Sequence, residues 1–124
     1  MSIKLFAAVA LIMLCLDIIW LFLRQDYHNN LIRTVQGSTG TIRVVPAALI
    51  YILIPAAVIF FTYDSKSFKE AAVKGAVLGT SMYGVYDLTN YATFTNWTLQ
   101  MTITDMAWGS ALCAAGGAVT HYLR

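Results

Sequence analysis

The sequence predicts an all-α fold, an integral membrane four-helix bundle, and two observations lead to this class. First, 59% of the 124 residues are hydrophobic and only 11% are charged, whereas an average soluble domain is about 25% charged. Second, the apolar residues form four runs, each near the roughly 20 residues that a helix needs to cross a bilayer. With a mean hydropathy of +0.68, residues 1–124 are expected to form a single transmembrane domain.

The expected spans are residues 3–23, 46–63, 68–90 and 101–122. The first has no small-residue cleavage pattern after it, so we expect a retained helix rather than a signal peptide. The second contains Pro55, whose missing N–H predicts a kink that frees the carbonyl of Tyr51. From residue 75 to residue 123, which includes most of the third and fourth spans, the only charged side chains are Asp87 and Asp105. This half of the chain is therefore expected to lie in lipid or against other helices.

The connections predict how the spans are threaded. Residues 24–45 are the only long polar stretch and are expected to be a loop, although the spacing of Tyr27, Leu31 and Val35 fits one side of a short interfacial helix. If the spans alternate, one flank carries the larger set of basic residues, and the positive-inside rule predicts that both termini are cytoplasmic. That set is Lys4, Lys66, Lys69, Lys74 and Arg124, against Arg24, Arg33 and Arg43 on the other flank.

Three aspartates inside the spans are the strongest functional signal. Asp17, Asp87 and Asp105 would each cost roughly 2.5–3.5 kcal/mol near the hydrocarbon centre, and the threading places all three roughly 5–10 Å below the same surface. Close carboxylates in a low dielectric cannot all stay ionised, so at least one is expected to hold a proton unless a cation such as Arg24 or His28 approaches. The candidate functional pocket comprises Asp17, Asp87, Asp105, Asn90, Trp20, Trp108, Tyr83 and Tyr51.

Small residues recur every four positions in the last two spans. The third span has Gly75 and Gly79 in line with Asp87, and the fourth has Gly109 and Gly117 in line with Asp105. Such spacing lets transmembrane helices approach closely. An antiparallel contact between these stripes would bring Asp87 and Asp105 to the same end.

Several sequence blocks resemble a known family. They are L-D-I-I-W-L at 16–21, P-A-A-L-I-Y at 46–51, Y-D-L-T-N-Y-A-T at 86–93 followed by Trp97, and D-M-A-W-G at 105–109, together with Tyr27. In order and spacing they resemble the small membrane proteins catalogued as domain of unknown function 2177. The resemblance implies a four-helix integral membrane protein, and the family's name assigns no activity.

Three classes of function stay open. The aspartates are expected to bind a proton or cation in a small carrier or channel, which would need a homodimer because four short helices enclose little volume. Alternatively, they act as general acid and base in a membrane-embedded lipid-modifying enzyme. The third hypothesis is a non-catalytic subunit that packs against other membrane proteins through its glycine stripes. In that case the aspartates would be hydrogen-bonded to Tyr, Trp or Asn and would only fix the register of the helices.

Cofactors and partners follow from the same residues. No established catalytic or cofactor motif is present, although Asp17, Asp87, Asp105 and Asn90 would suit a hard cation as oxygen ligands. The expected partners are the lipid bilayer and a small ion, proton or lipid. A net charge of +2 is too small to predict nucleic-acid binding.

Overall fold

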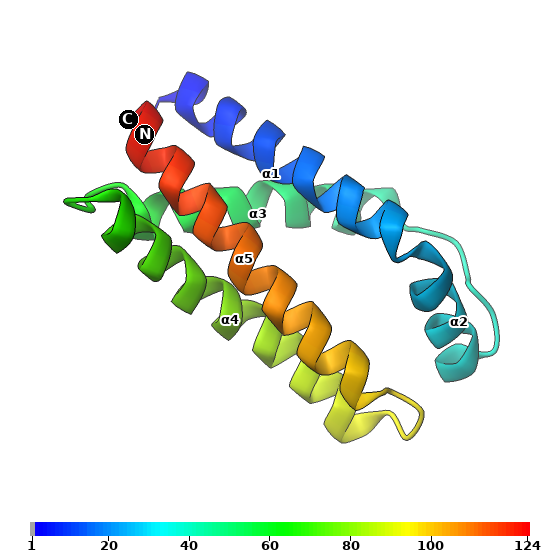
Figure 1. The fold of residues 1–124 in the computed structure, drawn as a ribbon. Helices are drawn as coiled ribbons and strands as arrows, with labels where there is room; N and C mark the ends of the chain where they lie inside the picture. The colour runs from blue at the N-terminus through cyan, green and yellow to red at the C-terminus, as the bar shows by residue number, and fades with distance from the viewer. Residues whose placement is uncertain (1) are drawn as a thin grey trace.

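The structure, a computed structural model, describes residues 2–124, and this part of the chain is all-α (Figure 1). Its helices are α1 (Ile3–Leu23), α2 (Gln25–Gln36), α3 (Val44–Thr62), α4 (Phe68–Thr93) and α5 (Leu99–Leu123). The all-α fold class is confirmed, and the four long helices begin and end within three residues of the predicted spans.

Two of the described helices, α1 and α3, are long and apolar enough to cross a membrane. Both have a mean hydropathy of 2.6 over their most apolar stretch, and only 22% and 17% of those stretches are buried. The core helix of a soluble protein would instead be mostly buried. Large apolar side chains such as Leu53 and Phe60 are 65% and 75% exposed, so the outside of α3 is a surface suited to lipid. A crossing by all four long helices stays a prediction.

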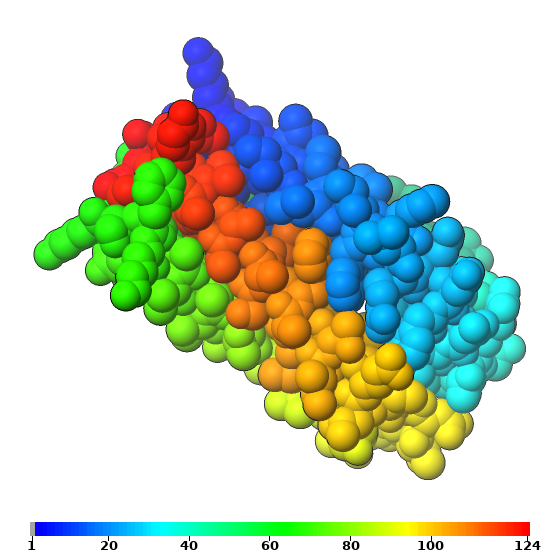
Figure 2. Space-filling view, viewed as in Figure 1, coloured from blue at the N-terminus to red at the C-terminus, as the bar shows by residue number. Residues whose placement is uncertain are grey.

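The helix α5 lies at the centre of the fold and contacts α1, α3 and α4. Figure 2 shows it between α1 and α2 on one side and α4 on the other. The main core is formed where these helices meet, with Val9, Val58 and Cys113 fully buried. The first residues of α1 and the last of α5 lie at the same end of the molecule, and α2 lies at the opposite end (Figure 1).

The closest pair is α4 and α5, and the predicted antiparallel contact of their small residues is confirmed. A Cβ atom at Gly75 would collide with the carbonyl group of Cys113, and one at Gly79 would collide with that of Gly109. Further along, Gly117 lies against the carbonyl group of Ala71. These backbone contacts require glycine, because any side chain would push the two helices apart.

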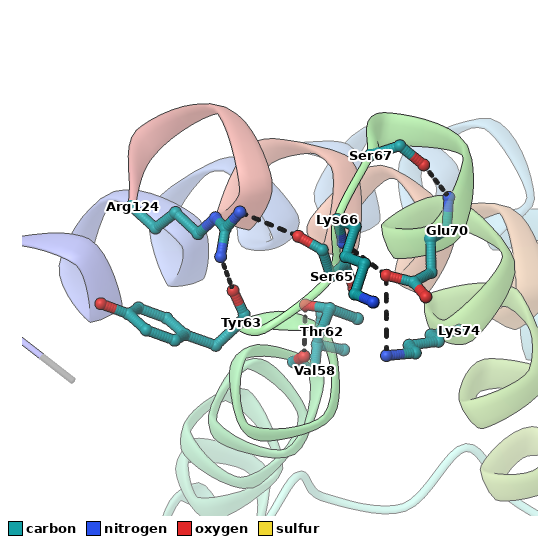
Figure 3. A network of polar contacts seen from close by, with 9 residues as sticks. All are labelled: Val58, Thr62, Tyr63, Ser65, Lys66, Ser67, Glu70, Lys74 and Arg124. Carbon is teal, nitrogen blue, oxygen red and sulfur yellow. Dashed lines mark hydrogen bonds and ion pairs between the residues drawn. The ribbon is translucent and has the colours of Figure 1, made fainter.

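The end that holds the termini is fixed by polar contacts (Figure 3). The guanidinium group of Arg124 donates to the carbonyl oxygens of Tyr63 at 2.6 Å and Ser65 at 2.8 Å. The Ser67 hydroxyl group caps α4 by accepting from the N–H of Glu70 at 3.0 Å. The turn between α3 and α4 is thereby tied to Arg124, the residue that follows α5.

One local expectation needs correction. Residues 24–45 are not all loop, because residues 25–36 form α2, which ends at Gly37 in the left-handed conformation, φ 86°. The alternative of a short helix is confirmed: its Leu31 is buried against Trp97, with Tyr27 and Val35 beside it. The helix α3 continues on both sides of Pro55, and the kink at that residue stays a prediction.

Candidate functional site

Asp17 joins three helices through its carboxylate group. The Tyr51 hydroxyl group of α3 donates to Oδ2 at 2.6 Å, and the indole Nε1 of Trp108 in α5 donates to Oδ1 at 2.9 Å. Trp20, one turn after Asp17 in α1, stacks on Trp108 with ring centroids 4.8 Å apart and planes 4° apart. Both carboxylate oxygens therefore have a donor, and this cluster fixes α1, α3 and α5 relative to one another.

Asp87 and Asp105 form a second, separate acidic site between α4 and α5. Asp87 is fully buried, and neither of its carboxyl oxygens has a hydrogen-bond partner among residues 2–124. Asp105, only 9% exposed, lies beside Asp87. Ionised carboxylates only accept and repel each other, so a hydrogen bond between the two groups would require a proton on one of them. One shared proton would satisfy the pair.

Two cavities meet at Asp105. The first, which we name the α3 cavity, has a volume of about 260 Å³, and its lining is Ile50, Ile54, Met82, Tyr83, Tyr86 and Asp105. The second, the α2 cavity, has a volume of about 220 Å³, and its lining is Leu21, His28, Leu31, Ile32, Tyr86, Trp97, Met101 and Asp105. Tyr86 and Asp105 border both. Asp105, one member of the acidic pair, is therefore reachable from two separate cavities.

A smaller gap connects the Asp17 cluster to the same region. It measures about 20 Å³ and is bordered by Asp17, Tyr51 and Tyr83, a volume that accommodates about one water molecule. Tyr83 also lines the α3 cavity. Tyr83 therefore borders both the gap beside Asp17 and the cavity beside Asp105.

Of the two cationic groups that the sequence suggested as partners of the acids, Arg24 does not pair with them and His28 lies near one of them. Arg24 forms no ion pair with Asp17; its guanidinium group lies 4.6 Å from the ring centre of Tyr27 and 5.5 Å from that of Trp20. Within the described chain the ion pair that forms is Lys74–Glu70, at 3.9 Å. His28 does fold in, carried by α2, and burial lowers the pKa of its imidazole group, an effect that the charge of Asp105 partly opposes.

The predicted pocket is thus assembled in part. The three aspartates lie in two sites, and no three carboxylate, His or Cys side chains in residues 2–124 converge to hold a metal ion, so the single three-carboxylate metal site is wrong. Asn90 lies one turn after Tyr86 in α4 and does not line the three spaces described above.

Comparison with known proteins identifies the chain's family. A family model described as a predicted membrane protein, DUF2177, matches residues 2–122. The chain belongs to the DUF2177 family. The resemblance of its sequence blocks is confirmed, and membership agrees with the two apolar helices α1 and α3. No curated protein and no solved structure matches this DUF2177 chain.

The α2 cavity of this DUF2177 protein adds residues that sequence reasoning left out of the pocket. Trp97 and Met101 enter it from the α4–α5 connection and the first turn of α5. The Tyr27 hydroxyl group is 2.6 Å from that of Thr98, the residue that caps α5, and this contact holds α2 over the cavity. The spacing of Tyr27, Leu31 and Val35 was the available signal, because it indicates a helix with one buried side.

Proposed function

We propose that this DUF2177 protein is a four-pass membrane protein with cytoplasmic termini, in which Asp87 and Asp105 form the proton-binding site of a small proton-linked carrier. The observation that carries the proposal is Asp87: it is fully buried, both carboxyl oxygens lack a partner within residues 2–124, and Asp105 lies beside it. Intramembrane carboxyl groups typically mark proton or ion pathways.

The lengths and the distribution of charge support the membrane part of the proposal. α4 and α5 have 26 and 25 residues, more than the roughly 20 needed to cross a bilayer. Their lower hydropathy has a local cause, because their glycines and polar side chains pack against each other and against the core. Arg124, bonded to the α3–α4 turn, belongs to the more basic end, which the positive-inside rule assigns to the cytoplasm.

The position of Asp105 supports a carrier rather than an open channel. It borders the α3 cavity and the α2 cavity, which are separate spaces that meet at this side chain. A group reachable from two sides can take up a proton from one and release it to the other when the surrounding helices shift. A continuous pathway would need such movement, or the homodimer that the small size of the bundle favours.

The two alternatives have less support. For a lipid-modifying enzyme, the linings of the α2 and α3 cavities contain no Ser or Cys nucleophile. For a packing subunit, the glycine stripes would have to face outward, but Gly75, Gly79, Gly109 and Gly117 all contact neighbouring helices of the same chain.

Infrared spectroscopy of the purified protein tests the proposal. We expect a protonated carboxyl band at neutral pH that is lost in Asp87→Asn and in Asp105→Asn. The band should persist in Glu70→Gln, a matched acid-to-amide change at an exposed carboxyl group. In proteoliposomes with a pH gradient, the same two Asn variants should lose at least tenfold in dye-detected proton movement. A wild type without such a band, or a band unchanged by both substitutions, would overturn the proposal.

A further inference from the structure

The α2 cavity contains nitrogen atoms that are left without hydrogen-bond partners. Trp97 lines the cavity, is 9% exposed, and its buried Nε1 has no partner in the described part of the chain. The Nε2 of His28, another lining residue, is also buried and unpaired. An indole N–H can only donate. Because an unpaired buried donor is unfavourable, the cavity is suited to a ligand with acceptor oxygens.

The charges around the cavity favour an anion once the acidic pair holds its proton. Arg24 lies close enough to influence His28 electrostatically, and its Nε and Nη2 are buried without partners among residues 2–124. The first turn of α5, which contributes Met101, also faces the cavity, and helix N-termini favour negative charge. The opposing charges are Asp105, Asp87 behind it in α4 and, farther away, Asp17 in α1, so a bound anion requires the shared proton.

The remaining lining is apolar and leads outward. Leu31 and Met101 are buried, whereas Leu21 and Ile32 are 41% and 37% exposed. A volume of about 220 Å³ is smaller than the roughly 300 Å³ at which sites for drug-sized ligands begin. The cavity therefore suits a head group and its first carbons, while a longer chain would leave past Leu21 and Ile32 toward the apolar exterior.

We propose that the α2 cavity binds the head group of an anionic amphiphile, an acyl chain that carries a carboxylate or a phosphate, with Trp97 and His28 as hydrogen-bond donors. This inference rests on the proposed function, because an anion can bind beside Asp105 only if Asp87 or Asp105 holds a proton. It deepens that function by naming the class of ligand whose binding is linked to the proton.

Direct binding to the purified full chain in maltoside micelles tests the inference. The probes are radiolabelled dodecanoate, dilauroyl phosphatidic acid, and dodecyltrimethylammonium as the cationic counterpart of the same chain length. We expect saturable binding of at least one anionic probe, weakened at least fivefold by Trp97→Phe and by His28→Gln. The control is His121→Gln, since His121 lies at the opposite end of the molecule beside Phe68, with ring centroids 4.8 Å apart; its binding should match the wild type.

The outcomes distinguish a carboxylate ligand from a phosphate ligand, and they distinguish this inference from the proposed function. Binding of dodecanoate alone assigns a carboxylate, and binding of phosphatidic acid alone assigns a phosphate; both support the inference. No anionic binding, equal or tighter binding of the cationic probe, or equal weakening by His121→Gln would overturn it. A protonated carboxyl band without anionic binding contradicts this inference alone. Anionic binding to a protein that lacks that band contradicts the proposed function and the linkage to the proton, and leaves only the ligand class in place.

Discussion

At the scale of single residues, three acids of the same type have different surroundings. Asp17 receives donors on both oxygens, from Tyr51 and Trp108, whereas Asp87 receives none within residues 2–124. Sequence position predicts how far along its helix each acid lies, because helix rise is constant. It could not indicate the partners, because these depend on how each helix is rotated about its axis and which side chain of a distant helix it meets.

The Tyr51–Asp17 hydrogen bond should contribute measurably to stability. Tyr51→Phe removes the hydroxyl group that donates at 2.6 Å and leaves the ring in place. We expect the free energy of unfolding to fall by about 1.5–3 kcal/mol, the usual range for a hydrogen bond to a charged group. Denaturant titration in detergent measures the change. Tyr122→Phe is the control, because Tyr122 is 75% exposed; an equal effect of both variants would show that the Asp17 contact does not matter.

At the scale of helices, the pairing of α4 and α5 could be predicted because a four-residue spacing of small side chains defines one face of each helix. The structure of residues 24–45 was harder to predict. α2 buries Leu31 against Trp97, at the far end of the α4–α5 connection, so its position depends on a tertiary contact that local sequence does not specify. The α2 cavity, formed by that contact, was missed for the same reason.

Two glycines of α4 should differ sharply in their tolerance of a methyl group. In Gly79→Ala the new Cβ would collide with the Gly109 carbonyl group, part of the rigid backbone of α5. We expect a loss of about 1–3 kcal/mol or more in unfolding free energy, as for other overpacked cores. Gly84→Ala would meet only the terminal methyl group of Met106, at 3.1 Å. That side chain can move, and alanine favours the helix by about 1 kcal/mol.

Denaturant titration of the two variants side by side checks this expectation. Gly84→Ala should stay within about 1 kcal/mol of the wild type, since the gain in helix propensity offsets a small shift of Met106. If both variants unfold at the same denaturant concentration as the wild type, the close contact between α4 and α5 is not what holds the pair together.

At the scale of the whole molecule, the two ends differ in chemistry. Arg124, Lys66 and Lys74 lie toward the end where the chain starts and finishes (Figure 3). The acidic pair lies toward the other end, near the α4–α5 connection and α2. A bilayer across α1, α3, α4 and α5 would place these groups near opposite surfaces.

Cysteine labelling tests whether four helices cross the membrane. In a background with Cys15→Ser and Cys113→Ala, single cysteines are placed by Lys66→Cys and Asn96→Cys, both at exposed positions. With four crossings, a membrane-impermeant maleimide should reach Asn96→Cys from outside intact cells and Lys66→Cys only after the membrane is opened. If α1 and α3 alone cross, both cysteines will share one side and label together.

The partners of Asp17 also set an order for assembly during synthesis. Tyr51 follows Asp17 by 34 residues and Trp108 follows it by 91. At about 5–20 residues per second, the ribosome makes Tyr51 about 2–7 s after Asp17 and Trp108 about 5–18 s after it. During that interval α1 carries a carboxyl group whose two donors do not yet exist, at a cost of roughly 2.5–3.5 kcal/mol if it enters the hydrocarbon centre. The environment of Asp17 is therefore complete only after α5 has been made, so a helix that is synthesised late completes the surroundings of an acid in a helix synthesised early.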